Sequence, residues 1–368
     1  MKTTEDSIPS ITRLPSEQDL ARIKANLIEH EQHSMCEKAF QNVDYEPGLM
    51  SAVVGPTGVG KTTLLTVLAA RLRMKFKSDN PGDVPVIESY MEASEEGTFN
   101  WKNFYRHGLL PHLNAPLDKE LSTNSGNPAV PSYRRTKDDL RNLVATNLRL
   151  RNTRVILLDE AHHVALGRPA PIMLQQLEVL KSFARVCKVH LVLCGPYQLM
   201  SSIALNPQLA RRITVVHFPR YLYPEDRQRF YDALCALVSV MSPWSLDVKL
   251  EDYVDFFYER SLGCIGLLKP WLDRAAKRAM EEQSAVITLE VLEGTAKGRK
   301  ELNIMVQDIE EGEAKLKDTP TDEETLQVRL GLPHKRKCVN AKTSNRQRRP
   351  GDRLPERDPV GEKRALAA

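Results

Sequence analysis

The sequence lacks the features that would place a protein in a membrane or outside the cell. Its six cysteines are scattered, and no two of them form a CxxC pair. Structural zinc sites and disulfide scaffolds need paired cysteines, so this scatter argues against both and favours a reducing compartment. The longest apolar stretch, residues 233–241, is about half as long as a membrane helix. The N-terminal MKTTEDSIPS has acidic residues and no apolar segment, so we expect a cytoplasmic protein without a secretory signal.

Charge of one sign is not in large excess. Lys and Arg number 52 and Asp and Glu number 48, which gives a net charge of +4. This value is too small to identify a nucleic-acid partner, so any basic face has to be argued locally. Hydrophobic residues make up 41% of the chain, which excludes a wholly disordered protein. A length of 368 residues suggests two or three folded units.

Five short segments rich in Val, Ile and Leu alternate with helical stretches between residues 46 and 220. Such near-continuous apolar runs are typical of strands that are buried on both faces, as in a parallel sheet between helices. We therefore expect an α/β core over residues 46–220 with a five-stranded parallel sheet. The strands are expected at residues 49–55, 84–90, 154–160, 189–195 and 213–218.

Helical patterns flank this core. Residues 1–16 are expected to form a flexible arm, and residues 17–45 a helical extension with a helix over 17–42. Residues 221–300 are expected to form a small all-α lid. Its helices are expected at residues 224–241, 249–261, 265–281 and 288–300.

The C-terminal residues 301–368 are strongly charged. Residues 301–330 have nine acidic and three basic side chains, and residues 331–368 have eleven basic and four acidic ones. Large apolar residues are few in the second half. We therefore expect a disordered tail whose charge reverses midway.

The sequence GPTGVGKT at residues 55–62 fits the pattern GxxxxGK[ST]. It follows an apolar strand and opens a helix, which is the context that the motif requires. The glycines let backbone N–H groups surround the β-phosphate of a nucleotide, and the helix N-terminus adds its dipole. Lys61 is expected to reach the β- and γ-phosphates of ATP, and the Thr62 hydroxyl to bind Mg²⁺. The expected nucleotide-binding residues are Gly55, Pro56, Thr57, Gly58, Val59, Gly60, Lys61, Thr62 and Thr63.

Two carboxylates end the third expected strand. Asp159 and Glu160 follow four aliphatic residues, which suits a strand whose carboxyl end meets the nucleotide. We expect Asp159 to hold Mg²⁺ through water. Glu160 is expected to orient and polarise the attacking water, which makes it the candidate general base for ATP hydrolysis.

Two histidines follow these acids and complete the letters DEAHH. We do not expect a metal site here, because adjacent side chains on a helix point in different directions. A DEAH helicase would need a second motor domain, and a lid of about 80 residues is too small to be one. His162 is therefore expected to pack near the active site.

Three cations are further candidates for the catalytic site. Arg211 and Arg212 precede the last expected strand, where a cation would lie near the edge of the sheet and away from the γ-phosphate bound by its own chain. This placement suits an arginine finger that serves a neighbouring subunit, with Arg212 as first choice and Arg211 as second. The alternative is a pair of solvated arginines. Lys269, in the first turns of a lid helix, is expected to contact the γ-phosphate, and the alternative is an ordinary surface lysine.

The phosphate-binding loop, the DE strand, the paired arginines and the helical lid together resemble an AAA+ P-loop ATPase. The segment FNWKNFY, the letters DEAHH and the lid pattern GxIGxLK narrow the likeness further. Over residues 15–300 the chain resembles the TnsC/TniB family of transposition regulators. One departure is Pro196, which stands where similar proteins place a small polar sensor and which cannot make that contact.

The resemblance implies an ATP- and Mg²⁺-dependent protein that forms homo-oligomeric rings or filaments on duplex DNA. It also implies partners, namely a target-selector protein and a transposase, with ATP hydrolysis controlling assembly. Two alternatives remain, a nucleotide-gated interaction switch that does not coat DNA and a helicase loader. Repetition along an assembly lets each subunit contribute few phosphate contacts. The candidate DNA-binding cations are Lys75, Lys77, Lys102, Arg106, Arg134, Arg135 and Lys137.

Overall fold

The computed structural model describes residues 15–25, 30–94, 98–114, 135–164, 170–204, 211–317 and 319–332. The chain divides into two compact units, Met1–Leu316 and Lys317–Ala368. Within the described ranges, none of the helices combines the length and the apolar character that crossing a bilayer requires. The larger unit contains every residue expected to bind nucleotide.

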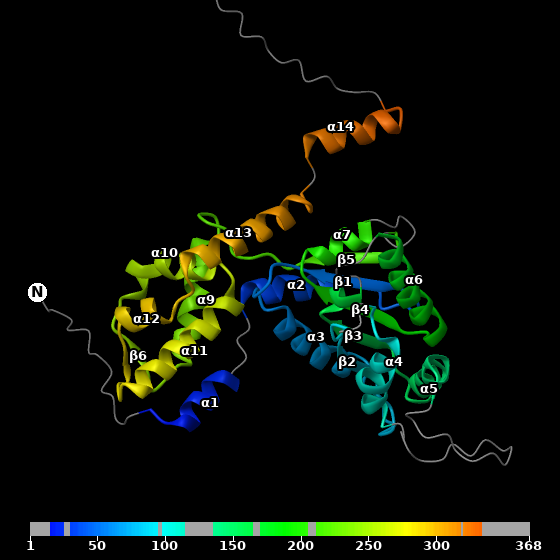
Figure 1. Ribbon diagram of the computed structural model, residues 1–368, viewed down its shortest axis with the longest axis horizontal. Helices are drawn as coiled ribbons and strands as arrows, with labels where there is room; N and C mark the ends of the chain where they lie inside the picture. Colours follow the sequence, from blue (N-terminus) through cyan, green and yellow to red (C-terminus); the bar gives the residue numbers. More distant parts are fainter. Residues whose placement is uncertain are drawn as a thin grey trace, which may run out of the picture. The chain divides into compact units, whose positions relative to one another are not determined.

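Five parallel strands form the central sheet, in the order β2-β3-β4-β1-β5 (Figure 1). Their bounds are β1 (Met50–Val54), β2 (Val86–Tyr90), β3 (Val155–Asp159), β4 (His190–Gly195) and β5 (Ile213–His217). Every residue of β1 and β4 is buried, because each of these strands has a neighbour on both sides. The expected five-stranded parallel sheet is confirmed.

Helices cover both faces of this sheet (Figure 1). Their bounds are α2 (Glu31–Gln41), α3 (Lys61–Lys75), α5 (Lys137–Leu150), α6 (Ala170–Cys187) and α7 (Gln198–Ala204). Ala52 and Val54 of β1 belong to the hydrophobic core shared with α5 and α6, whereas Val53 belongs to the core shared with α2 and α3. Successive side chains of a strand point to opposite faces, so a strand between two cores needs a continuous apolar run.

A smaller group of helices, the lid, follows β5. Its bounds are α9 (Arg227–Ser239), α10 (Leu250–Ser261), α11 (Ile265–Glu281) and α12 (Leu289–Thr295). The lid has its own core, in which Phe230, Phe257 and Trp271 are fully buried. The expected helical lid is confirmed, with one addition. The two-residue strands β6 (Ser245–Leu246) and β7 (Val286–Ile287) pair in parallel beside the helices.

The single helix expected over residues 17–42 is wrong. Helix α1 (Glu17–Ala25) ends before α2 begins, and His30 has an extended backbone with φ −126° and ψ 170°. The side chains of Leu20 and Ile23 enter the lid core, whereas Phe40 of α2 belongs to a core of the sheet. The apolar spacing of this segment is typical of one helix, but its two halves pack into two different cores and form two helices.

The expectation of disorder from residue 301 is also wrong for the start of the tail. Helix α13 (Arg299–Ala314) buries Leu302 and Ile309 among its acidic residues. Glu313 accepts hydrogen bonds from the Arg220 guanidinium, with Nε to Oε1 at 3.0 Å. A few apolar contacts and one largely buried ion pair thus order a helix whose composition is typical of a solvated tail.

The smaller unit contains helix α14 (Pro320–Arg329). Thr319 caps it reciprocally, since its hydroxyl accepts from the Asp322 N–H and the Asp322 carboxylate accepts from the Thr319 N–H. This capping box satisfies donors that the first turn leaves free. The expected arm over 1–16 lies mostly outside the described residues, as does the basic stretch from residue 333 onward.

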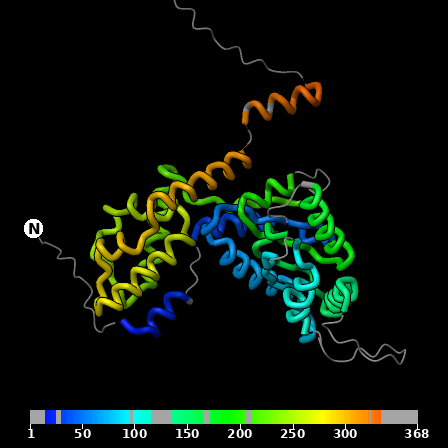
Figure 2. The backbone as a smooth tube through the Cα atoms, viewed as in Figure 1, coloured from blue at the N-terminus to red at the C-terminus, as the bar shows by residue number. Residues whose placement is uncertain are grey.

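The segment 98–114 connects β2 toward α5 as a series of short helical turns (Figure 2). These are α4 (Trp101–Asn103), a π-helical turn (Phe104–Leu109) and a 3-10 turn (Leu110–Leu113). The rings of Phe99 and Trp101 meet edge to face, with centroids 4.8 Å apart. The Trp101 indole N–H donates to Gln176 Oε1 of α6 at 2.6 Å, so this aromatic segment is held against the sheet domain.

Candidate nucleotide-binding site

The loop at residues 55–62 runs from the end of β1 into the first turn of α3. Gly58 has φ +80° and Gly60 has φ +114°, a left-handed region that side chains with a Cβ rarely adopt. Gly60 is the residue that precedes α3. The two glycines let the backbone turn sharply onto a helix N-terminus, which is the geometry that binds phosphate.

Lys61 lies inside this loop. Its side chain is buried, and Nζ donates to the carbonyl oxygens of Gly55 at 3.0 Å and Pro56 at 2.9 Å. Burial lowers the pKa of Lys61, while the carboxylates of Asp159 and Glu160 act in the opposite direction. The amine is therefore held next to the acidic pair that ends β3.

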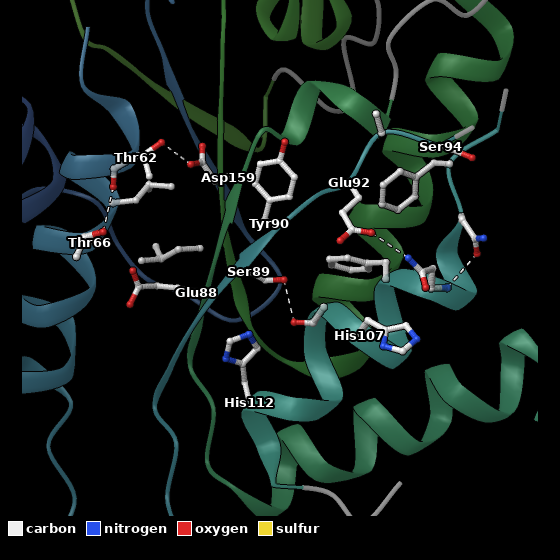
Figure 3. A pocket seen from close by; sticks show the side chains of 18 residues that line it. Thr62, Thr66, Glu88, Ser89, Tyr90, Glu92, Ser94, His107, His112 and Asp159 are labelled. Carbon is white, nitrogen blue, oxygen red and sulfur yellow. Dashed lines mark hydrogen bonds between the residues drawn. The ribbon is translucent and has the colours of Figure 1, made fainter. Parts of the chain in front are cut away.

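Thr62 and Asp159 are 97 residues apart in the sequence and meet at the carboxyl edge of the sheet. The Thr62 hydroxyl donates to Asp159 Oδ2 at 2.7 Å (Figure 3). A hydroxyl and a carboxylate are oxygen ligands of the kind that Mg²⁺ prefers. The two residues predicted as its ligands are thus side by side, and the donor set fits the ion.

Glu160 has an unusual backbone for a residue with a side chain, with φ +52°. Its N–H donates to Asp159 Oδ1 at 2.9 Å, and its Oε2 lies 3.0 Å from His162 Nδ1. Burial, together with the nearby His163 and Lys61, lowers the pKa of His162 to about 4, so this imidazole is neutral at pH 7. Strained residues of this kind cluster at functional sites.

The two histidines after Glu160 do not diverge as expected. Residues Ala161–Val164 form a 3-10 turn, and the ring centroids of His162 and His163 lie only 4.1 Å apart. Glu160, His162 and His163 each offer a ligand atom, and these atoms all lie within 4.8 Å of one another. Adjacent residues of a 3-10 turn leave the backbone about 120° apart, so side-chain conformation brings the two imidazoles together, and backbone direction alone does not exclude a shared metal ion.

Cys194 is a member of the site that the sequence argument missed. It lies in β4, between the strands that end at the loop and at Asp159, and it is fully buried. Burial raises the pKa of its thiol well above the ordinary value, and the nearby Asp159 carboxylate raises it further. Pro196 follows the end of β4, whereas the Cys194 thiol lies within this strand and interacts with the Asp159 carboxylate.

Two histidines near the start of α2 border the loop from another side. A Cβ built on Gly60 would lie 3.1 Å from His33 Nε2, and the His30 imidazole lies 2.9 Å from the Tyr221 hydroxyl. Burial lowers the pKa of His30 to about 3 and that of His33 to about 4, so both rings are neutral. Within the described residues, buried polar atoms of His30, Gln32 and His33 lack hydrogen-bond partners.

The lid reaches the loop through Gly266 and Leu267. A Cβ on Gly266 would lie 2.5 Å from the Gly58 carbonyl oxygen, and a Cβ on Gly58 would lie 2.6 Å from Leu267 Cδ2. Lys269, expected at the γ-phosphate, instead donates to the Lys24 carbonyl of α1 at 3.1 Å and lies 3.5 Å from Asp273. The contacts that the structure gives Lys269 are therefore within the lid and α1.

The backbone contact at Gly266 gives a testable expectation. Gly266→Ala is expected to lower the free energy of unfolding by about 1–3 kcal/mol, because the new methyl meets a backbone carbonyl that cannot rotate away. Gly294→Ala is the matched control, since a Cβ there meets nothing within 4 Å. Denaturant unfolding followed by circular dichroism measures both variants. Equal stability of the two would contradict the close packing of lid and loop.

Arg211 and Arg212 precede β5, and the Arg212 carbonyl accepts from the N–H of Met50, the first residue of β1. The loop follows the other end of β1. The arginines therefore lie at the N-terminal end of the strands, whereas the chain's own phosphate-binding loop lies at their C-terminal end. This is the placement that the arginine-finger hypothesis requires.

The candidate DNA-binding cations fall in two regions. Lys75 and Lys77 line a surface hollow of about 810 Å³. Three further cations line it that were not predicted from the sequence to bind DNA. Those further cations are Arg149, Arg154 and Lys188. The second region includes Lys102 of α4, Arg106 of the π-helical turn, and Arg135 and Lys137 at the start of α5. Arg134 lies outside the described residues.

A cavity of about 740 Å³ adjoins the Thr62–Asp159 pair (Figure 3). Its walls come from α3, β2 and the segment 98–114, which is tied to β2 by a hydrogen bond from the Ser89 hydroxyl to the Gly108 carbonyl at 2.9 Å. Its polar lining includes Glu88, Tyr90, Glu92, His107 and His112. The aromatic segment thus forms a wall beside the predicted magnesium ligands.

Comparison with known proteins agrees with this architecture. Residues 45–202 match the family model described as an AAA domain. The chain resembles the ORC2 protein of Aeropyrum pernix in its ADP form, at 14% identity and a TM-score of 0.50, over 79% of this chain and 70% of that one. The ADPNP-ADP complexes of that protein give 14% identity and a TM-score of 0.49, over 79% and 69% of the two chains.

The Drosophila ORC bound to DNA gives 14% identity and a TM-score of 0.46, over 88% of this chain and 87% of that one. No curated protein matches the sequence. At this level of identity the likeness is one of fold. The sheet order, the loop and the lid are those of an AAA+ P-loop fold.

Proposed function

We propose that this protein binds and hydrolyses ATP with Mg²⁺ at the loop between β1 and α3. The observation that carries the proposal is the hydrogen bond between Thr62 and Asp159 beside the buried amine of Lys61. A loop of left-handed glycines, a lysine and two magnesium ligands from different elements meet at one edge of the sheet. These are the parts that phosphoryl transfer in P-loop proteins uses.

Each residue has a distinct part in this chemistry. Lys61 exchanges the Gly55 and Pro56 carbonyls for phosphate oxygens, and the backbone N–H groups of the loop hold the β-phosphate. Thr62 and Asp159 hold Mg²⁺, which neutralises charge that develops on the phosphates. Glu160 orients the attacking water and takes its proton. The buried Gln32 Oε1, which has no hydrogen-bond partner among the described residues, is a candidate for a contact with the nucleotide base.

The finer proposal is that the protein oligomerises on duplex DNA and couples target selection to a transposase. It is supported by the segments FNWKNFY, DEAHH and GxIGxLK, which resemble the TnsC/TniB family. The cations around the hollow at Lys75 and Lys77 support it as well. Arg212 supports it too, because a cation at the far edge of the sheet suits a head-to-tail neighbour. Repetition of such subunits along DNA multiplies a modest number of phosphate contacts.

Lys61→Ala is expected to abolish ATP-dependent assembly on DNA, because the variant lacks the cation that neutralises the β- and γ-phosphates. Electron micrographs and sedimentation of the protein with an ATP analogue and duplex DNA measure the assembly. Lys181→Ala is the matched control, since its amine pairs with Glu178 on the outside of α6. Assemblies that persist in Lys61→Ala would overturn the proposal.

The salt dependence of DNA binding separates the remaining alternatives. Wild-type affinity for DNA is expected to fall steeply with salt concentration, as phosphate contacts release counterions. ATP binding without any DNA binding would instead support the nucleotide-gated interaction switch. Recruitment of a helicase rather than a transposase would support a loader.

A further inference from the structure

The turn after β3 brings together three metal-ligating side chains that the proposed hydrolysis mechanism uses only in part. Ligand atoms of Glu160, His162 and His163 lie within 4.8 Å of one another, and all three residues are half-buried. The Glu160 Oε2 and His162 Nδ1 atoms are 3.0 Å apart. Among the described residues, the buried Nδ1 atoms of both histidines lack a hydrogen-bond partner of good geometry.

We propose that Glu160, His162 and His163 form a second metal site, for a transition metal such as Zn²⁺. Two imidazole nitrogens and one carboxylate oxygen are a donor set of this kind, which leaves a fourth position for water. In a tetrahedral zinc site, neighbouring ligand atoms are separated by about 3.4 Å. The Glu160–His162 pair, at 3.0 Å, is already close to that separation, and the ligand atom of His163 lies within 4.8 Å of both.

This site differs in chemistry from the one at Thr62 and Asp159. Mg²⁺ prefers oxygen ligands in octahedral geometry and binds imidazole poorly, so it selects the hydroxyl and carboxylate of those two residues. Zn²⁺ accepts nitrogen ligands and a low coordination number. The two ions are therefore sorted by adjacent but different ligand sets.

The expected consequence of metal binding rests on the proposed ATPase function. A metal at the second site would bind one oxygen of the Glu160 carboxylate and withdraw electron density from it, so that the carboxylate would be a weaker base toward the attacking water. Lys61, Thr62 and Asp159 are not consumed, so ATP still binds. The metal thus converts a hydrolysing subunit into one that retains ATP.

The experiment titrates Co²⁺ into the full-length, nucleotide-free protein in magnesium-free buffer and follows visible absorption, which reports nitrogen and oxygen ligands in a low-coordinate site. One equivalent is expected to bind, and Zn²⁺ is expected to displace it. His163→Ala is expected to weaken binding at least tenfold. Glu160→Gln is expected to weaken it too, and its amide is close in size to the carboxylate, so it tests the site if His163→Ala unfolds. His107→Ala is the matched control, because that histidine belongs to the neighbouring cavity.

Absence of the absorption band would overturn the proposal, as would a band that survives both His163→Ala and Glu160→Gln. The titration contains no nucleotide, so its outcome is independent of the ATPase function. A band in a protein that does not hydrolyse ATP leaves the metal site standing and removes the proposed function. ATP hydrolysis by a protein that shows no Co²⁺ absorption band leaves the proposed function standing and removes the metal site. In an active protein, micromolar Zn²⁺ is expected to lower kcat in the wild type but not in His163→Ala, and equal inhibition of both would overturn the stated consequence.

Discussion

Glu160→Gln is expected to lower the rate of ATP hydrolysis by about 10²–10⁴-fold, with ATP affinity nearly unchanged. Glutamine keeps the size of the side chain but does not accept a proton from the attacking water. Lys61, Thr62 and Asp159 remain in place, so the phosphates and Mg²⁺ are still held. Single-turnover hydrolysis and calorimetric ATP binding, measured on the same preparations, separate the two effects.

The matched control for this variant is Glu92→Gln. Glu92 lines the adjoining cavity and accepts a hydrogen bond from Asn103 Nδ2 at 3.0 Å. Its replacement by glutamine makes the same chemical change in the adjoining cavity and leaves the residues of the turn after β3 unchanged. If Glu160→Gln hydrolyses ATP as fast as this control, Glu160 is not the general base.

Arg212→Ala is expected to lower hydrolysis in the assembled state by about 10³–10⁵-fold, the effect typical of an arginine finger. Because Arg212 lies at the end of the sheet opposite to its own loop, the loss is expected in the neighbouring subunit's site. ATP binding by single subunits is expected to persist. Steady-state hydrolysis on DNA measures the defect, and Arg211→Ala shows which of the two arginines carries it.

Mixing two inactive variants tests the direction of this contact. A Glu160→Gln subunit still binds ATP and assembles, keeps Arg212, and can complete the site of an Arg212→Ala neighbour that keeps its glutamate. In an equal mixture about a quarter of the sites have this arrangement, so hydrolysis is expected to return to that extent. Arg278→Ala, which removes a lid arginine paired with Glu282, is the matched control and should be active alone. No recovery in the mixture would refute a finger supplied between subunits.

The parts of the site that the sequence could predict are those written in consecutive residues. Gly58, Gly60 and Lys61 stand at fixed spacing because the backbone must turn within a few residues onto a helix. Asp159 and Glu160 end an apolar strand, and parallel strands bring their carboxyl ends to one edge. Their meeting with Thr62 therefore followed from sequence order and a general rule of sheet geometry.

The parts that could not be predicted depend on packing between distant segments. Cys194 joins the site because β4 lies between β3 and β1, an order that the sequence does not state. Helix α13 packs through the buried Leu302 and Ile309 and pairs Glu313 with the distant Arg220, contacts that its solvated composition does not reveal. The proximity of the His162 and His163 rings depends on the conformations of their side chains within a 3-10 turn, which two adjacent letters do not reveal.

The contact of Gly266 with the carbonyl of Gly58 places main chain directly against main chain. Elsewhere in a protein, side chains between two moving parts change rotamer and absorb small displacements. At Gly266 no side chain lies between the two backbones, so we expect a displacement of the loop at Gly58 to be passed on to the start of α11. Phosphate binding at the loop is therefore expected to change the position of the lid helices as well.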